Sequence, residues 1–233
     1  CEHNNRRTNA RLPCANGEFL MVNARAIILA GHGINCEEET KFAFAQSGIA
    51  GDVVHVNDLI ASPNRLDAYQ VLAFPGGFSY GDDTGSGNAL ANQLRAHVWH
   101  ELSRFLERDT LTIGICNGFQ ILVQLGLLPA GNGIYGQREV ALLPNDNAIY
   151  TDRWVDLSFQ SVSPWVKGIT QVSFPIAHGE GKFFTTPSVA ASLKKNHQIA
   201  ARYVKGEICT YQSLSANPNG SLGDIAAITD TTG

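Results

Sequence analysis

The chain has 233 residues, of which 44% are hydrophobic, so it is long enough to bury a substantial core in one domain. Its 17 basic and 21 acidic residues leave a formal net charge of −4, without the basic surplus that binds nucleic acid or an anionic membrane surface. The apolar runs are far shorter than the roughly 20 residues that span a bilayer. We therefore expect a soluble protein whose partners are neither nucleic acid nor membrane.

Residues 1–20 are rich in Asn and Arg and lack the apolar stretch of roughly 7 to 15 residues that marks a secretory signal peptide. The only methionine, Met21, directly precedes the first strand-like segment. We therefore expect residues 1–20 to be a tag, a leader or a disordered extension. No internal repeat or low-complexity linker divides residues 21–233, which we expect to form one domain.

From Met21 onward, short β-branched runs alternate with longer amphipathic segments, the pattern of βαβ units around a mostly parallel sheet. Strands are expected at 26–30, 52–56, 71–74 and 111–115, and helices at 37–47, 89–107 and 121–125. In 89–107, apolar residues recur at steps of three or four and form one stripe to be buried. This half of the chain therefore predicts an α/β fold.

After Pro144 the sequence changes to alternating segments separated by Gly, Pro and Asn, which favours antiparallel strands and hairpins. Strands are expected at 154–159, 171–176, 199–204 and 207–212. The predicted fold class is thus α/β, an open and largely parallel sheet flanked by helices, with a small antiparallel β-rich portion in the C-terminal half.

The five cysteines are an odd number without C-x-x-C pairs, which argues against a disulfide framework or a zinc site and favours the cytoplasm. One of them, Cys116, lies between Gly114 and Gly118, where an expected strand runs into an expected helix. That arrangement is typical of a nucleophile elbow, whose glycines let neighbouring backbone pass close by. Free N–H groups at the start of the helix are expected to lower the pKa of the thiol. The alternative is a small buried apolar Cys116, and the other four cysteines are interpreted as structural or incidental.

Gly76 and Gly77 directly follow the expected strand 71–74. A glycine pair in this position can direct a backbone N–H at a developing oxyanion, and the N–H of Asn117 beside the nucleophile is the candidate second donor. The alternative is a turn that needs glycine only for its dihedral freedom. The phosphate-binding spacing Gly-x-x-x-x-Gly-Lys-Ser/Thr is absent from the sequence.

His178 and Glu180 lie two residues apart on an extended segment, so both side chains face the same side. This spacing fits a general base with an orienting carboxylate, which would complete a triad with Cys116. The alternative, which we favour, is a glycine-rich loop that contacts substrate through its backbone.

Five segments carry a resemblance that runs from about residue 25 to the last residue: 31–40 (GHGINCEEET), 75–82 (PGGFSYGD), 114–120 (GICNGFQ), 175–183 (PIAHGEGKF) and 217–221 (NPNGS). Together they resemble the glutaminase subunits of phosphoribosylformylglycinamidine synthase, which are class I glutamine amidotransferases. The resemblance implies a flavodoxin-like fold. It also implies that Cys116 attacks the side-chain amide of glutamine, forms a γ-glutamyl thioester and releases ammonia for purine biosynthesis.

By the same resemblance the oxyanion-binding and substrate-binding residues are Gly76, Gly77, Asn117, Gln120, His178, Gly179 and Glu180. The His178 segment matches the loop that holds the α-carboxylate and α-amino groups of glutamine. No cofactor is expected in this chain, because ATP and Mg²⁺ belong to the partner synthetase subunit, which uses the ammonia to convert formylglycinamide ribonucleotide to the amidine. A small bridging subunit is the other expected partner.

The sequence departs from the family pattern in two places. The family's triad His and Glu lie in a Pro-His-Pro-Glu segment that we expect beyond Gly233, so residues 21–233 are expected to be C-terminally incomplete. The corresponding alternative is a catalytically silent subunit that binds glutamine and docks with the synthetase. Residues 83–87 (DTGSG) stand where the family often has Tyr-Leu-Arg-Ala-Gly. A cysteine hydrolase outside the amidotransferases is the remaining alternative.

Overall fold

The computed structural model describes residues 10–13, 19–22, 24–160 and 162–233, and the chain divides into two compact units after Phe119. The expectation for residues 1–20 falls largely on residues outside the described ones. β1 (Ala10–Pro13), which lies in that segment, pairs with β2 (Phe19–Val22), which extends beyond it, in an antiparallel sheet of two strands. The extent of the domain in residues 21–233 stays a prediction.

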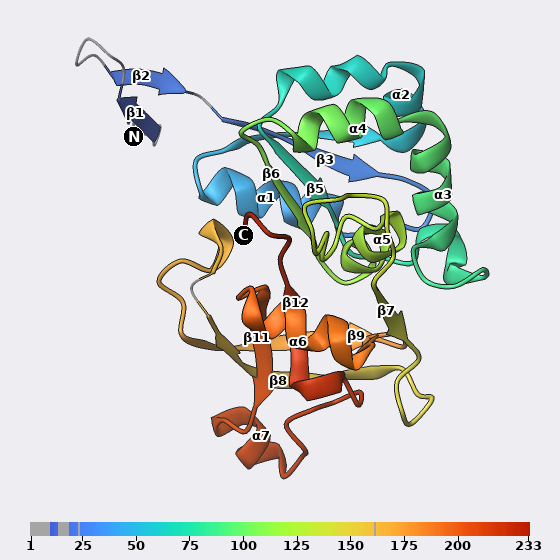
Figure 1. The fold of residues 1–233 in the computed structure, drawn as a ribbon, viewed down its shortest axis with the longest axis vertical. Helices are drawn as coiled ribbons and strands as arrows, with labels where there is room; N and C mark the ends of the chain where they lie inside the picture. Colours follow the sequence, from blue (N-terminus) through green and yellow to red (C-terminus); the bar gives the residue numbers. More distant parts are fainter. Residues whose placement is uncertain (1–9, 14–18, 23, 161) are drawn as a thin grey trace, which may run out of the picture. The chain divides into compact units, whose positions relative to one another are not determined.

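The first unit is built on a parallel sheet of β3 (Arg25–Ala30), β4 (Ala50–His55), β5 (Val71–Phe74) and β6 (Leu111–Gly114). The strand order is β4-β3-β5-β6, so the order reverses between β3 and β5. Every residue of β5 is buried, as expected of a central parallel strand covered on both faces. The predicted α/β class and parallel sheet are confirmed, and Figure 1 shows α1 on one face and α4 on the other.

Helices connect these strands: α1 (Glu37–Gln46), α2 (Val56–Ala61), η1 (Pro63–Ala68), α3 (Asn88–His97) and α4 (Trp99–Leu106). The prediction of one helix over 89–107 is wrong, because the helix is interrupted at Val98, whose φ is −130° and ψ 0°. The expected apolar stripe is nevertheless buried on both sides of the break, at Leu90, Leu94, Leu102 and Phe105. The periodicity therefore located the buried face but not the break. Helix α5 (Asn117–Leu125) follows β6, and the division between the units falls within it.

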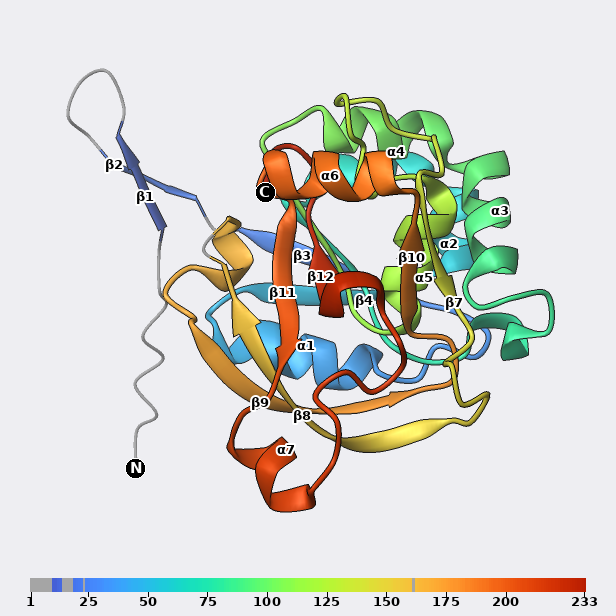
Figure 2. The same cartoon turned by 60° about the horizontal axis from the view of Figure 1, so that its bottom comes forward.

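The second unit contains an antiparallel sheet in the order β12-β11-β8-β9, formed by β8 (Thr151–Phe159), β9 (Gln171–His178), β11 (Ile199–Val204) and β12 (Ile225–Ile228) (Figure 2). A further antiparallel pair joins β7 (Val140–Leu143) to β10 (Lys182–Thr185). The predicted antiparallel portion is therefore confirmed. The short helices η3 (Pro164–Val166) and η4 (Leu222–Asp224) lie in connecting segments.

The expected strand at 207–212 is wrong, because these residues form helix α7 (Glu207–Gln212). The buried carboxylate of Asp156 in β8 accepts hydrogen bonds from the backbone N–H groups of Gly206, at 3.1 Å, and Cys209, at 2.9 Å. A side-chain oxygen that accepts from the first N–H groups of a helix stabilises it as an N-cap does. Here the cap comes from a distant strand and overrides the local alternation.

Helix α6 (Pro187–Lys195) was not predicted, although its start carries a sequence signal. Thr186 is the N-cap, and its hydroxyl accepts a hydrogen bond from the N–H of Val189 at 3.4 Å. Pro187 follows at the first helical position, which its fixed φ favours. None of the helices in the described part of the chain combines the length and hydropathy that crossing a lipid bilayer requires.

Candidate active site

Cys116 lies at a sharp bend between β6 and α5, with the left-handed φ of 54°. Such a φ is uncommon for a residue with a side chain and occurs where the surroundings impose it. Gly118 is essential to the bend, because a Cβ at this position would overlap the backbone carbonyl of Phe74 in β5. The Cys116 side chain is exposed. The backbone therefore has the geometry of a nucleophile elbow.

The Gly76–Gly77 turn lies beside this bend, because both segments leave the carboxyl edge of the same parallel sheet. A Cβ on Gly76 would be 3.5 Å from the Cβ of Cys116. Gly77 has a φ of 147°, and a Cβ there would come within 2.7 Å of the Cα of Ile34. Ile34 also forms a β-bridge with Gly77. Glycine is thus required at Gly77 for both its conformation and its contacts.

The pKa of the Cys116 thiol is raised, which is opposite to the lowering expected from the helix start. Burial of the sulfur among protein atoms is the largest cause, and the negative charge of Asp82 adds to it. The backbone N–H groups of Asn117 and Gly77 donate to the sulfur and oppose this rise. Although the residue is exposed, desolvation therefore outweighs the two donors. The resting group is a thiol, and its proton must leave as the sulfur attacks.

Backbone N–H groups close to the sulfur of Cys116 are candidate donors for an oxyanion that would form beside it. The structure thus brings together Cys116, Gly77 and Asn117, which the sequence analysis placed in one site, and Gly76 completes the turn. Among the described residues, no group of three or more His, Cys, Asp or Glu side chains is arranged to hold a metal ion.

The side chain of Asn117 has a role that sequence reasoning missed, since only its backbone N–H was singled out. It is fully buried, its Oδ1 accepts from the N–H of Ser79 at 3.0 Å, and its Nδ2 donates to Asp82 Oδ1 at 3.2 Å. Both partners lie in η2 (Ser79–Asp82), where Tyr80 and Asp82 have left-handed φ values of 55°. One amide therefore joins the bend at Cys116 to the strained end of the glycine loop.

Cys36 was interpreted as structural or incidental, yet it lies next to this site. A Cβ on Gly76 would be 3.4 Å from the Cys36 sulfur, and the N–H of Cys36 donates to the carbonyl of Gly76 at 3.3 Å. Its thiol pKa is raised by burial, then by the charges of Glu39, Cys116 and Glu37. Cys36 lies in the segment 31–40 that carries the resemblance, but nothing in that segment sets this cysteine apart. Its place beside the site follows from the contact between the loops after β3 and β5.

The second unit contains the other predicted site residues. His178 Nδ1 faces Asn145 Oδ1 at 3.2 Å, and its Nε2 faces Asn219 Nδ2 at 3.5 Å. Burial lowers the pKa of this imidazole, and both ring nitrogens face amides. These contacts fit a neutral ring with the proton on Nδ1. They favour a structural His178 in a substrate-contacting loop over a general base.

Gln120 and Glu180 also meet in the second unit, where Gln120 Nε2 donates to the backbone carbonyl of Glu180 at 2.8 Å. Gly181 lets the loop fold onto His178, because a Cβ there would be 2.5 Å from ring atoms of that residue. The predicted residues therefore form two groups. One surrounds Cys116 in the first unit, and the other consists of Gln120 and the loop 178–181 in the second. In the region that departs from the family pattern, Gly87, with a φ of 73°, is the N-cap of α3.

Comparison with known proteins identifies the family to which this chain is related. A family model described as a CobB/CobQ-like glutamine amidotransferase domain matches residues 23–233. Phosphoribosylformylglycinamidine synthase subunit PurQ of Methanococcus maripaludis strain C5 is 44% identical over 211 residues, which cover 90% of this chain and 78% of that protein. The subunit of the same name from Dehalococcoides mccartyi is 40% identical over 215 residues, covering 91% and 82%.

Among solved structures, PurLQS from Thermotoga maritima matches with a TM-score of 0.66 and 29% identity, over 89% of this chain and 82% of that one. Sequence and structure therefore point to the same relatives. The chain belongs to the CobB/CobQ-like glutamine amidotransferase family, in the group of phosphoribosylformylglycinamidine synthase subunit PurQ.

Proposed function

We propose that this chain is the glutaminase subunit of a phosphoribosylformylglycinamidine synthase. It hydrolyses glutamine to glutamate and ammonia through a thioester on Cys116. The ammonia passes to a synthetase subunit that converts formylglycinamide ribonucleotide to formylglycinamidine ribonucleotide in de novo purine biosynthesis. The observation that carries the proposal is Cys116 at a left-handed bend with the N–H groups of Gly77 and Asn117 directed at its sulfur.

The chemistry follows from these groups. As the thiol of Cys116 loses its proton, the sulfur attacks the amide carbon of glutamine, and the negative charge that develops on oxygen is stabilised by the N–H groups of Gly77 and Asn117. Collapse of this intermediate breaks the C–N bond, and the nitrogen leaves as ammonia after it takes up the proton that the thiol released. Water then adds to the thioester, releasing glutamate and restoring the thiol. Because both ring nitrogens of His178 face amides, we do not assign the proton transfers to it.

The second group of residues supplies substrate binding in this proposal. Gln120 and the loop of His178, Gly179 and Glu180 receive the α-carboxylate and α-amino groups of glutamine. ATP and Mg²⁺ are assigned to the synthetase subunit, and the likeness to PurLQS supports a complex with that subunit and a small bridging subunit. We place this complex in the cytoplasm, where its free cysteines stay reduced.

The test compares Cys116→Ala with the unchanged chain, each in complex with the synthetase. Glutamine-dependent amidine formation and ammonia release should fall by roughly 10⁴-fold or more, because the covalent step is lost. Amidine formation from added ammonium chloride should persist, which shows that the complex is intact. Full glutamine hydrolysis by Cys116→Ala would refute the assignment.

A second candidate is a glutamine-binding and docking subunit without turnover, favoured by the contacts of His178, whose two ring nitrogens face the amides of Asn145 and Asn219. Calorimetry would then detect glutamine binding to the complex. No ammonia would be released, and mass spectrometry would find no thioester on Cys116. Accumulation of the thioester would exclude this candidate.

A further inference from the structure

The loop 178–181 is held by hydrogen-bond donors from the rest of the second unit. Each of its four successive carbonyl oxygens accepts a hydrogen bond: His178 O from Asn145 Nδ2 at 2.9 Å, Gly179 O from Asn145 N at 2.9 Å, Glu180 O from Gln120 Nε2 at 2.8 Å and Gly181 O from Ser221 Oγ at 3.3 Å. All four carbonyls are thus engaged by protein donors. These contacts hold the backbone of the loop in one conformation, in which its N–H groups and side chains can bind the carboxylate of a ligand.

Asn145 is the centre of these contacts and is only 3% exposed. Besides its two donor contacts to the loop, its Oδ1 accepts from the N–H of Gly181 and faces His178 Nδ1, both at 3.2 Å. Its Nδ2 also donates to Ile149 O at 3.0 Å and Thr151 Oγ1 at 3.2 Å. A primary amide presents donors and an acceptor side by side, and a carboxylate or a hydroxyl does not match this set. One amide therefore fixes both ends of the loop.

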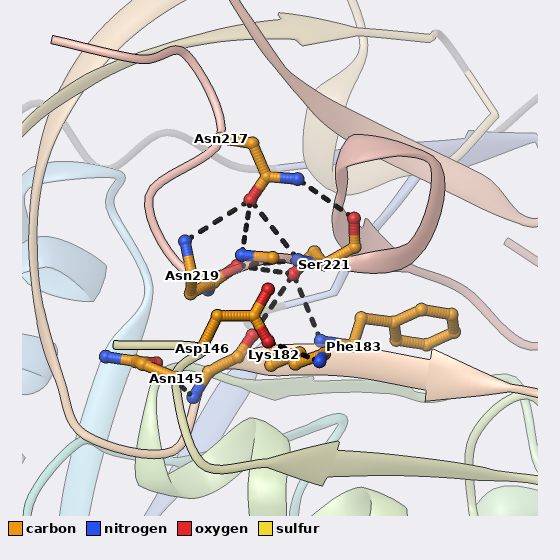
Figure 3. Close-up of polar contacts among 9 residues, drawn as sticks. Asn145, Asp146, Lys182, Phe183, Asn217, Asn219 and Ser221 are labelled. Atoms are coloured by element: carbon orange, nitrogen blue, oxygen red, sulfur yellow. Dashed lines mark hydrogen bonds and ion pairs between the residues drawn. The ribbon is translucent and has the colours of Figure 1, made fainter. Parts of the chain in front are cut away.

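The segment 217–221 holds the other side of the loop through Ser221, and Figure 3 shows the contacts of Asn217 and Ser221 within this segment and with Phe183. Asn217 Oδ1 accepts hydrogen bonds from the backbone N–H groups of residues 219, 220 and 221, at 3.3, 2.9 and 3.2 Å. In this turn, Ser221 Oγ donates to Gly181 O and accepts a hydrogen bond from the N–H of Phe183 at 3.0 Å. The ion pair between Lys182 and Asp146 lies beside these contacts. Ser221 thus supports the loop independently of Asn145.

We propose that Asn145 is a positioning residue, which holds the loop 178–181 in the conformation that receives the carboxylate end of glutamine. This inference rests on the proposed function, since the ligand of the loop is glutamine only if the chain is a glutaminase subunit. Asn145 acts through the loop and touches none of the reacting atoms in this proposal. Its loss therefore weakens glutamine binding and leaves the step at Cys116 largely unchanged.

The experiment compares Asn145→Asp with Gln198→Ala, each in complex with the synthetase subunit. Asn145→Asp keeps the acceptor oxygen and loses the Nδ2 donor. Gln198 is a matched buried amide, 1% exposed, whose Nε2 donates to the carbonyls of Pro129, at 2.7 Å, and Thr229, at 3.2 Å. We expect Asn145→Asp to raise KM for glutamine roughly tenfold or more and to change kcat by less than about threefold. Gln198→Ala should lose thermal stability without this shift in KM.

Two further measurements keep the proposal testable if Asn145→Asp folds poorly. Ser221→Ala removes the other support of the loop, and it should raise KM for glutamine in the same direction. In a Cys116→Ala background, calorimetry should show the same weakening of glutamine binding without any turnover. Unchanged KM and unchanged binding, or equal effects of Asn145→Asp and Gln198→Ala, would overturn the proposal.

The proposed function and the role of Asn145 are tested by different variants, so each can fail without the other. If Cys116→Ala abolishes hydrolysis while Asn145→Asp behaves like Gln198→Ala, the inference about Asn145 fails and the function stands. If Cys116→Ala retains hydrolysis, the proposed function itself fails, whatever the result at Asn145.

Discussion

Replacing Asn117 by Asp tests whether its side chain couples the nucleophile to the glycine loop. The substitution keeps the shape and the acceptor for the N–H of Ser79 but puts a carboxylate where Nδ2 now lies, 3.2 Å from Asp82 Oδ1. Two negative charges at that separation repel by about 5 kcal/mol at an effective dielectric constant of about 20. Protonation of one carboxyl removes this repulsion. At pH 7 it costs about 4 kcal/mol for a group with an ordinary pKa of about 3.9.

Because protonation of one carboxyl costs less than the repulsion, its cost is the expected loss of stability. Asn117→Asp should therefore lower the free energy of unfolding by about 4 kcal/mol at pH 7. Repulsion raises the folded pKa of the shared pair above its unfolded value. The variant therefore approaches the stability of the unchanged chain below pH 4, and its deficit grows as the pH rises toward the folded pKa. Urea unfolding between pH 4.5 and 7.5 measures this. Because Gly77 begins the loop that ends at Asp82, kcat for ammonia release should fall roughly 10²-fold.

The decisive measurement adds Asp82→Asn to Asn117→Asp, which exchanges the acid and the amide across the same contact. The pair regains a donor opposite an acceptor, so most of the lost stability and activity should return. Asn92→Asp is the control, since Asn92 is an exposed residue of α3 whose side chain contacts Asn88, and a surface change there should cost less than about 0.5 kcal/mol. If the losses of the two single variants simply add in the double variant, the coupling is refuted.

Three further predictions concern other contacts. Asp82→Asn alone should lower the pKa of the Cys116 thiol, because the Asp82 charge contributes to raising it; the rate of iodoacetamide alkylation against pH would show no shift if this is wrong. Gly118→Ala should cost about 3 kcal/mol or more, since its Cβ would overlap the carbonyl of Phe74, and an unchanged Tm would contradict it. Although burial raises the pKa of Asp156, its hydrogen bonds hold it below the ordinary value, so the stability that it contributes above about pH 3.8 is lost as the pH falls through the folded pKa. Asp156→Asn should flatten that acid limb of the unfolding curve, and an equally steep limb would exclude the carboxylate as its source.

The parallel sheet was predictable because local composition decides it. Val71–Phe74 is apolar throughout, and its four residues are buried as β5. The bend at Cys116 was also visible, since Gly-x-Cys-x-Gly between a strand and a helix leaves few backbone alternatives. In both cases the information lies within a few residues of the feature that it determines.

The misread features depend on residues far apart in the sequence. The segment Glu207–Gln212 alternates like a strand, but the carboxylate of Asp156, about fifty residues earlier, caps it as a helix. The pKa of Cys116 was expected to fall because the helix start is local, whereas the desolvation that raises it comes from the assembled surroundings. Asn145 was missed for the same reason, since its contacts lie more than thirty residues away in the loop 178–181.

The strain in the first unit gives the buried contacts of Asn117 a part in the proposed reaction. Tyr80, Asp82 and Cys116 all have left-handed φ values between 54° and 55°. Each such residue costs of order 1 kcal/mol or more and persists only where its surroundings impose the conformation. Asn117 contacts the backbone at Ser79 and the side chain of Asp82 while its own N–H serves Cys116. A single buried amide therefore holds the two strained segments against each other. Loss of the Asn117 amide would relax the strained backbone and move the N–H groups of Gly77 and Asn117 away from the sulfur. Stability and activity should therefore be lost together at this position.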